Sequence, residues 1–473
     1  MKHFTKEFWI VAIALLCAAC NTTHTDKPSQ KSVKLITLDP GHFHAALVQK
    51  KMYAAIDSVV AVFAPDGLDV EEHLKRIDGY NRRSDDPTHW KESVYTGNDY
   101  LEKMLTQKPG NVVVIAGNNG KKSEYIQKSV DAGLHVLADK PMCIDSTGFQ
   151  SLLKSFDVAD RNKVLLYDIM TERSEITTIL QKELSQIPDI FGKLKTGSVE
   201  EPAVTKESIH HFYKYVSGKA LKRPAWFMDV TQQGEGLVDV TTHLVDLVQW
   251  ECFPEQIIDY TKDIHVLKAR RWPTPMTQSQ FSAITGMTSF TDFLKKDVSD
   301  SILSVFSNGE ITYQIKGVYA KVSVIWNYQA PEGAGDTHYS IMRGDKANLV
   351  IRQNKEENYI PQLYIEPSKG TDLNTYGTGL TKSFEKITQK YPGVGLQKQG
   401  DGWIIQIPDT YRIGHEAHFA EVMERFLQYL KDGKLPEWEV PNMKAKYYTT
   451  TTALQLAKRD QPSKSLSFSN PKK

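Results

Sequence analysis

The sequence predicts an α/β fold in which a doubly wound parallel sheet is followed by an α+β domain with a largely antiparallel sheet. In residues 33 to about 167, short runs rich in Val and Ile alternate with amphipathic stretches, which is typical of βαβ units. Further on, strand-like runs follow one another with hairpin-like turns between them, which indicates antiparallel pairing. A length of 473 residues favours two or more domains.

In the first domain, four strands and three helices are predicted in alternation. The strands are "VKLITLD", "DSVVAVFAP", "NVVVIAG" and "LHVLAD", and the helical stretches are "HAALVQKKMYAAI", "DVEEHLKRI" and "KKSEYIQKSVDAG". Between Ile77 and Asn98 lies a charged, turn-rich insertion, which we interpret as a surface loop whose position would also suit a flap over a cleft.

The second domain is predicted from five strand-like runs and two closing helices. The strands are "SILSVFS", "GEITYQIKGV", "AKVSVIWNYQ", "ANLVIRQ" and "GWIIQIP", with a hairpin turn at "SNGE". The helices are "EAHFAEVMERFLQYLKDG" and "NMKAKYYTTTTALQLAKRD". We therefore divide the chain into a signal at 1–20, a polar tether at 21–32, a nucleotide-type domain at 33–166 and an α+β substrate domain at 167–473.

The N-terminus has the layout of a bacterial export signal. Two lysines precede an apolar run and small residues, and the run is too short for a permanent membrane span. "LCAAC" resembles a lipobox in which Cys20 becomes the lipid-modified first residue. Cys17 stands where an aliphatic residue is usual, so a secreted or inner-membrane-tethered form stays open. We expect an exported, periplasmic lipoprotein anchored in the membrane by a lipid on Cys20.

Charge and cysteine content exclude several classes of protein. The chain has 58 Lys plus Arg against 57 Asp plus Glu with no block of like charge, so nucleic acid is not expected as a partner. Outside the signal only Cys143 and Cys252 remain, which excludes a disulfide scaffold and is a poor structural zinc set. We expect these two to be buried thiols.

The stretch "LITLDPGHFHAAL" reads as a strand, a turn and the start of a helix, an arrangement that suits a pyrophosphate. Of the three glycines of a G-x-G-x-x-G motif only Gly41 is present, because Asp39 and His44 take the other two positions. His42 and His44 also form an H-x-H pair of the kind that holds a metal in some barrel hydrolases. The chain lacks the eight units of a barrel, so no metal site is predicted and a metal hydrolase is the minor alternative.

Two further strands of the parallel sheet end in polar residues. One ends in Gly117, Asn118 and Asn119, and the other in Asp139, Lys140 and Pro141. The carboxyl ends of parallel strands meet at one edge, where ligands bind. Lys140 is therefore expected in the crevice.

A second cluster occurs in "QQGEGLVDVTTHLVDLVQW". Asp239 and His243 are four residues apart, so on a helix they would share a face, and a carboxylate beside a histidine is a common general base for an alcohol proton. A structural hydrogen bond between the two is the alternative. Asp246 falls on the same side, and we interpret it as an ordinary cap or surface carboxylate.

Together these motifs resemble the glucose–fructose oxidoreductase and inositol dehydrogenase family of NAD(P)-dependent enzymes. That family has an E-K-P tripeptide with an active-site lysine and a D-x-G-x-H-x-x-D stretch with a catalytic histidine. Here Asp139, Lys140 and Pro141 stand for the first, and Asp239, His243 and Asp246 for the second, with Thr241 in place of the glycine.

The resemblance implies NAD or NADP as cofactor, with a Rossmann fold in the first domain. It makes Lys140, His243 and Asp239 the catalytic residues. It implies that the cofactor is bound by the turn and the strand ends, namely Gly41, His42, Phe43, His44, Asp66, Gly117, Asn118, Asn119 and Asp139. Ala64 occupies the usual place of the acidic residue that binds ribose and Asp66 lies two later, so the choice between NAD and NADP stays open.

The resemblance also implies oxidation of a hydroxyl of a sugar or glycoside. Because an exported protein meets no free NAD(P) pool, we expect the cofactor to be held tightly. Trp226 and Trp272 could stack on a sugar or belong to the core, and His415 and His418 could reach the cleft or form one helix face. An NAD-dependent glycosidase and a non-catalytic sugar-binding lipoprotein are the alternatives, and the antiparallel sheet could form a homo-oligomer.

Overall fold

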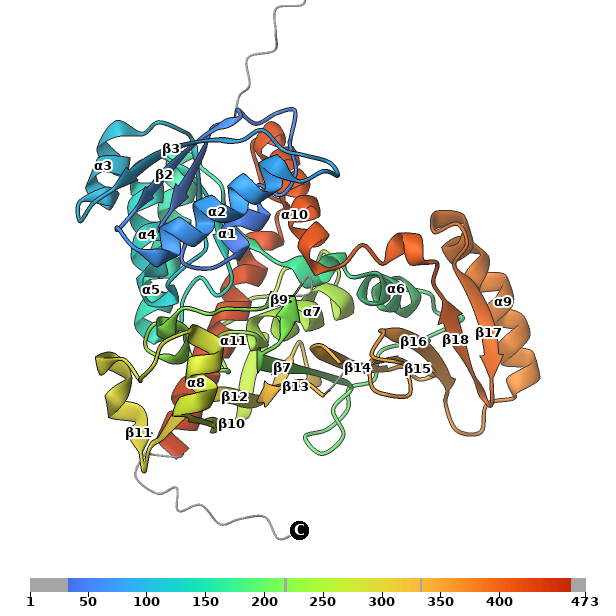
Figure 1. Cartoon of the computed structure of the whole chain (residues 1–473). Coiled ribbons are helices and arrows are strands. Elements are labelled where there is room, and N and C mark those ends of the chain that lie inside the picture. Colours follow the sequence, from blue (N-terminus) through green and yellow to red (C-terminus); the bar gives the residue numbers. More distant parts are fainter. Residues whose placement is uncertain (1–32, 217–218, 332–333, 461–473) are drawn as a thin grey trace, which may run out of the picture.

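The computed structural model describes residues 33–216, 219–331 and 334–460, arranged around two sheets (Figure 1). The predicted signal, tether and lipid-modified Cys20 lie outside the described residues. Within the described part of the chain, the structure has no helix with the length and apolar character needed to cross a membrane.

The first sheet has six strands in the order β3-β2-β1-β4-β5-β6, and all of its pairs are parallel. Its strands are β1 Leu35–Leu38, β2 Val59–Ala64, β3 Lys91–Thr96, β4 Val112–Ile115, β5 His135–Asp139 and β6 Leu166–Ile169. The predicted doubly wound sheet is confirmed. The strand order reverses between β1 and β4, which places a ligand crevice at their carboxyl ends.

Five helices of the first domain connect these strands. They are α1 His44–Leu47, α2 Leu68–Arg82, α3 Tyr100–Gln107, α4 Asn119–Asp131 and α5 Ser146–Asn162. Asn118 and Asp145 begin α4 and α5 by accepting hydrogen bonds from backbone N–H groups of their first turns.

Two predictions for this domain are wrong in detail. The helix predicted from His44 onward ends after one turn, at Leu47. The insertion predicted as a surface loop contains β3, which pairs with β2 along its whole length. β3 is an edge strand with mostly exposed side chains, so it lacks the apolar run by which a buried strand is recognised.

The second sheet has ten strands, and only the β13–β7 pair is parallel. Its strands are β7 Val204–Tyr213, β10 Ile264–Thr277, β11 Val298–Ser299, β12 Ile302–Ile315, β13 Val318–Gln329, β14 Thr337–Arg343, β15 Ala347–Arg352, β16 Gln362–Pro367, β17 Gly395–Gln399 and β18 Gly402–Gln406. A separate hairpin joins β8 Tyr215–Val216 and β9 Lys219–Ala220. The predicted, largely antiparallel second domain is confirmed.

The hairpin predicted at "SNGE" does not form, because β12 runs straight through it. Gly309 pairs with Val324 in the ladder, and a Cβ placed on it would lie 2.5 Å from Cδ2 of Leu237. The glycine therefore marks a close approach by Leu237 and not a turn.

Helices cover the second sheet on the side that faces the first domain (Figure 1). They are α6 Ile176–Ser185, α7 Thr241–Cys252, α8 Gln278–Thr285 and α9 Leu373–Lys390, with short 3-10 turns η1 Thr171–Ser174, η2 Ala225–Met228, η3 Asp292–Asp297 and η4 Asp409–Tyr411. α7 is buried on almost every side, polar residues included, and lies between the sheet and α11 Glu439–Asp460.

The last two helices return to the first domain. α10 His415–Asp432 lies beside α1 and β6, and its side chains Phe419, Val422, Met423 and Phe426 belong to the core of the parallel sheet (Figure 1). α11 joins both cores, the first through Tyr447 and the second through Leu454. The first core is thus completed by residues that follow the whole second sheet in sequence.

A buried ionic network holds the two domains together around α7. Arg173 of η1 donates two hydrogen bonds of 2.7 Å to Asp246 of α7 and one of 2.9 Å to Glu439 of α11. Lys446 of α11 contacts Asp246 at 2.8 Å and Asp168 of β6 at 2.7 Å. The interpretation of Asp246 as a cap or surface carboxylate is wrong, because its side chain is 2% exposed and binds two cations.

Candidate active site

Lys140 follows β5 and meets Asp239, which lies just before α7. The Lys140 Nζ is 2.7 Å from the Asp239 Oδ1, and both side chains are almost buried, at 10% and 8% exposed. The structure therefore brings Lys140 and the second cluster together, as the sequence predicts, through a direct ion pair between Lys140 and Asp239. The carboxylate fixes the position of the ammonium group.

His243 lies in the first turn of α7, and its buried Nδ1 has no hydrogen-bond partner. The predicted pairing of Asp239 with His243 is wrong, because Asp239 precedes the helix and its carboxylate is bonded to Lys140. Burial is the largest cause that lowers the pKa of His243, and the Lys140 ammonium lowers it further. The imidazole is thus neutral at physiological pH, with a ring nitrogen free to exchange a proton.

The turn after β1 is bonded to the end of β4. The backbone N–H of His42 donates to the Ala116 carbonyl at 3.1 Å, and Asp39 adopts a left-handed φ of 46°. A Cβ on Gly117 would lie 2.2 Å from the Asp39 carbonyl oxygen, so only glycine fits at Gly117. Asp39 stands where the phosphate-binding motif has glycine, and its carboxylate accepts a hydrogen bond of 2.7 Å from the Tyr125 hydroxyl.

The two histidines of this turn gather around Asp139 at the end of β5. The Asp139 Oδ2 is 2.9 Å from the Nδ1 of His44 and 3.8 Å from the Nδ1 of His42. The ring of His415, at the start of α10, has its centroid 5.5 Å from that of His44. His415 therefore reaches the cleft edge, whereas His418 is buried on α10.

Residues 225–236, which we call the cover segment, lie across the carboxyl edge of the parallel sheet. The Trp226 indole N–H donates to the Asp69 carboxylate at 2.9 Å, and a Cβ on Gly41 would lie 3.1 Å from the Trp226 ring. The Gly120 backbone N–H donates to the Gln232 carbonyl at 2.8 Å. No sequence motif marks these contacts, since only the fold brings the second domain against this edge.

The other residues predicted to hold the cofactor also lie at this edge. The side-chain amide of Asn118 donates to Gln232 at 2.8 Å, and that of Asn119 donates to the Gln233 carbonyl at 2.7 Å. Asp66 is exposed just beyond β2, and the Phe43 ring packs at 4.5 Å from His44. Trp272 lies in β10 with its ring 4.5 Å from the Arg270 guanidinium.

These residues fit a dinucleotide at the end of the site that holds Lys140 and His243. At the other end, the cover segment stands against the phosphate turn and would have to move. The Lys140 ammonium and the unpartnered Nδ1 of His243 suit a redox centre where an alcohol proton is exchanged. At the phosphate turn, Trp226 and Asp69 stand against Gly41. A pyrophosphate can therefore enter once the cover segment moves aside.

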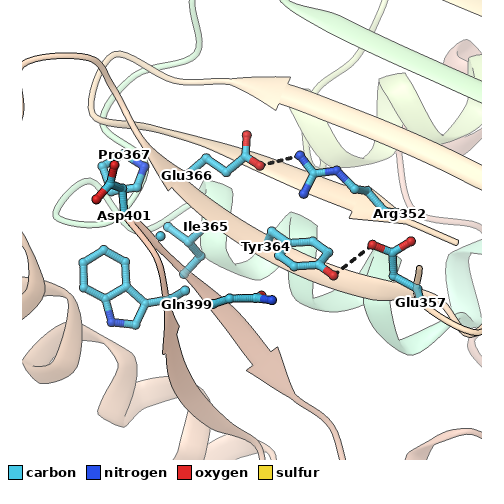
Figure 2. A pocket seen from close by; sticks show the side chains of 10 residues that line it. Arg352, Glu357, Tyr364, Ile365, Glu366, Pro367, Gln399 and Asp401 are labelled. Atoms are coloured by element: carbon cyan, nitrogen blue, oxygen red, sulfur yellow. Dashed lines mark hydrogen bonds and ion pairs between the residues drawn. The ribbon is translucent and has the colours of Figure 1, made fainter. Parts of the chain in front are cut away.

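A cavity of about 490 Å³ lies among β15, β16 and β18, on elements that carry none of the predicted site residues (Figure 2). Its walls hold an ion pair between Arg352 and Glu366, and the Tyr364 hydroxyl donates to Glu357 at 3.0 Å. Four of its lining side chains are thus paired with one another, and the residues predicted for the site lie on other elements.

Comparisons with protein families match both parts of the chain. Residues 41–167 match the oxidoreductase family with an NAD-binding Rossmann fold, named GFO/IDH/MocA, and residues 180–458 match a "Putative oxidoreductase C terminal domain". A search of curated protein sequences found no match.

Solved structures show the same fold over nearly the whole chain. A "putative oxidoreductase" from Parabacteroides merdae is 60% identical, with a TM-score of 0.90 over 91% of this chain and 98% of that one. Levoglucosan dehydrogenase in complex with NADH and levoglucosan is 12% identical, with a TM-score of 0.56 over 91% and 98%. Biliverdin reductase from Synechocystis, with biliverdin and NADP+, is also 12% identical, with a TM-score of 0.53 over 90% and 99%. At 12% identity these last two show the fold alone.

Proposed function

The chain belongs to the oxidoreductase family that joins an NAD-binding Rossmann domain of the GFO/IDH/MocA type to this C-terminal domain, and from this premise we propose that it oxidises a hydroxyl of a sugar or glycoside. The observation that carries the proposal is the Lys140–Asp239 ion pair together with the buried imidazole of His243, whose pKa the Lys140 ammonium lowers. One group polarises an oxygen and the other takes a proton.

Lys140 acts on the substrate oxygen. Its ammonium group, held by Asp239, donates a hydrogen bond to the hydroxyl oxygen and stabilises the negative charge that develops as the oxygen becomes a carbonyl. Because Asp239 is buried with Lys140, the ammonium keeps one fixed direction and needs no reorganisation during the reaction.

His243 acts on the hydroxyl proton. Its neutral imidazole accepts this proton at a ring nitrogen that faces the crevice, because the residue is 8% exposed although its Nδ1 is buried. The NAD(P) cofactor supplies, when bound, the acceptor for the hydride from the carbon. The proton and the hydride thus leave the same C–OH group, which balances the oxidation.

We further propose that the cofactor is retained during turnover and that the protein is an exported, membrane-anchored lipoprotein. The cover segment supports retention, because it bridges the parallel sheet through Trp226 and Gln232. A cofactor bound beneath this segment would leave only as fast as the segment opens.

Nucleotide analysis of the purified protein tests the proposal. We expect NAD or NADP in the denatured extract, and we expect turnover of a panel of sugars and aryl glycosides. Lys140→Met and His243→Gln should each lower kcat by more than about 100-fold, in line with the loss of a general acid–base group, while the extract keeps its nucleotide. Full activity in either variant would overturn the assignment.

The same assay separates the other functions. Release of the aryl group without net reduction of cofactor identifies a redox-assisted glycosidase. Sugar binding with no nucleotide in the extract and no turnover identifies a binding protein and contradicts the proposal.

A further inference from the structure

Among the residues that the structure describes, the buried carboxylate of Asp139 makes no ion pair with a lysine or an arginine. The residue is 4% exposed, and the groups that its oxygens contact are the imidazoles of His42 and His44. Of the two nearby ammonium groups, that of Lys122 donates to the main-chain oxygen of Asp139, and that of Lys140 is paired with Asp239. A buried carboxylate is costly unless a cation compensates it.

The two imidazoles present ring nitrogens to that carboxylate, with their Nδ1 atoms 3.8 and 2.9 Å from the Asp139 Oδ2. The His44 backbone N–H also donates to the His42 Nδ1 at 3.4 Å, which makes this nitrogen an acceptor facing the carboxylate. Neutral imidazoles and a carboxylate are the donors that divalent transition metals take from proteins.

Their spacing matches a metal centre. Zn²⁺ binds imidazole nitrogen at about 2.0–2.1 Å and carboxylate oxygen at about 2.0–2.2 Å, so neighbouring ligand atoms in a tetrahedral site lie about 3.3–3.6 Å apart. Here the ligand atoms of His42, His44 and Asp139 all lie within 4.8 Å of one another, and the two contacts to Asp139 measure 2.9 and 3.8 Å.

We propose that His42, His44 and Asp139 bind a divalent first-row transition metal ion such as Zn²⁺. The inference goes beyond the proposed oxidation, which needs no metal. Three protein ligands leave a fourth position open, as catalytic zinc sites do. Asp139 is adjacent to Lys140, so this position would take an oxygen atom of a small oxygen-bearing ligand at the same crevice.

Neighbouring charges permit a cation here. The Arg223 guanidinium donates to the carbonyls of His211 and Phe212, at 3.2 and 3.0 Å, and Asp239 offsets Lys140. His415 stands beside His44, with the ring centroids 5.5 Å apart, so a further imidazole lies at the edge of the cluster. A metal ion bound here would therefore compensate the negative charge of Asp139, and among the described residues no other ion pair on that carboxylate would compete with it.

Titration with Co²⁺, a spectroscopic substitute for Zn²⁺, tests the site. Chelator-treated full-length protein should bind about one Co²⁺ per chain with visible absorption, and Zn²⁺ should displace it. His44→Gln and Asp139→Asn should each weaken Co²⁺ binding by more than about 100-fold, beyond the 10–100-fold typical of outer-shell partners. His73→Gln is the matched control, because His73 is a buried histidine on α2 outside this cluster, and it should bind Co²⁺ like the parent.

Three results would overturn the metal site. They are a parent protein that gives no Co²⁺ spectrum, variants that keep parent affinity, and a loss in His73→Gln equal to that in His44→Gln. If His44→Gln fails to fold, the isosteric Asp139→Asn and chelator-reversible thermal stabilisation of the parent decide the question. The readout needs no substrate or nucleotide, so its failure is distinct from failure of the proposed oxidation.

Discussion

The side chains of Glu92, in β3, and Gln49 are joined by a hydrogen bond. Each of them also has a buried oxygen atom without a hydrogen-bond partner among the described residues. The Gln49 amide donates to Glu92 Oε1 at 2.7 Å, while Glu92 Oε2 and Gln49 Oε1 have no hydrogen-bond partner. Burial raises the pKa of Glu92 from 4.5 to about 7, although the hydrogen bond from Gln49 opposes this rise. A proton on Glu92 supplies the donor that the pair lacks.

The raised pKa makes stability depend on pH in a definite direction. The folded state binds a proton at Glu92 between pH 4.5 and about 7 that the unfolded state releases, so this contribution is fully present below pH 4.5 and is lost as the pH rises through about 7. Glu92→Gln cannot ionise. At pH 8 its free energy of unfolding should exceed that of the parent by on the order of 2 kcal/mol, and at pH 4 the two should agree. Urea unfolding at both pH values checks this, and equal curves at pH 8 would contradict it.

Residue types and spacing mark which residues are candidates for the site, but they do not give the pairings between them. Lys140 and His243 are candidates because strand ends and family motifs mark them. The partner of Asp239 could not be identified in this way, since the four-residue rule holds only inside a helix and α7 begins two residues later, at Thr241. The burial of Asp246 likewise depends on Arg173 and Lys446, which are distant in sequence.

At the scale of elements, the cover segment lies across the sheet edge, and we expect it to slow the entry of the cofactor. Trp226 holds it to α2 through Asp69, so Trp226→Phe removes one hydrogen bond and keeps most of the apolar contact. Stopped-flow fluorescence with nucleotide-free protein should show NADH associating several-fold faster with this variant. Trp272→Phe is the control, because Trp272 lies in β10 against Arg270, and it should associate like the parent. Equal rates in all three proteins would show that the segment does not gate entry.

Elements with strong periodic patterns were predicted correctly, and elements shaped by neighbours were not. β1, β2, β4 and β5 are apolar runs buried on both faces, which sequence alone reveals. β3 lies at an edge and has no such pattern. "SNGE" has the composition of a turn, yet its glycine serves the contact with Leu237, a residue distant in sequence.

For the whole molecule, the network around Asp246 ties the two domains into one unit. Asp246→Asn keeps the shape of the side chain and removes the charge shared by Arg173 and Lys446, leaving two buried cations undercompensated. We expect a loss of about 3–5 kcal/mol in the free energy of unfolding. Asp292→Asn is the control, because its ion pair with Lys295 is exposed, and it should change stability by less than about 1 kcal/mol. Urea unfolding measures both, and a loss below 1 kcal/mol for Asp246→Asn would refute the structural role.

The division at residue 166 falls at the first residue of β6, and it does not say which residues complete the core of the parallel sheet. β6 ends at Ile169, close to that boundary. The apolar face of α10 shows that the helix is amphipathic, but nothing in its periodicity says which of two sheets it covers. That choice is set by tertiary packing, through Phe419 and Phe426.

The return of α10 to the parallel sheet has a consequence for biosynthesis. The nascent N-terminal half emerges from the ribosome first, yet Phe419, Val422, Met423 and Phe426 are made only after the entire second sheet. Until then one flank of β6 and α1 lacks the apolar cover that α10 provides, so the core of the parallel sheet can be completed only late in synthesis.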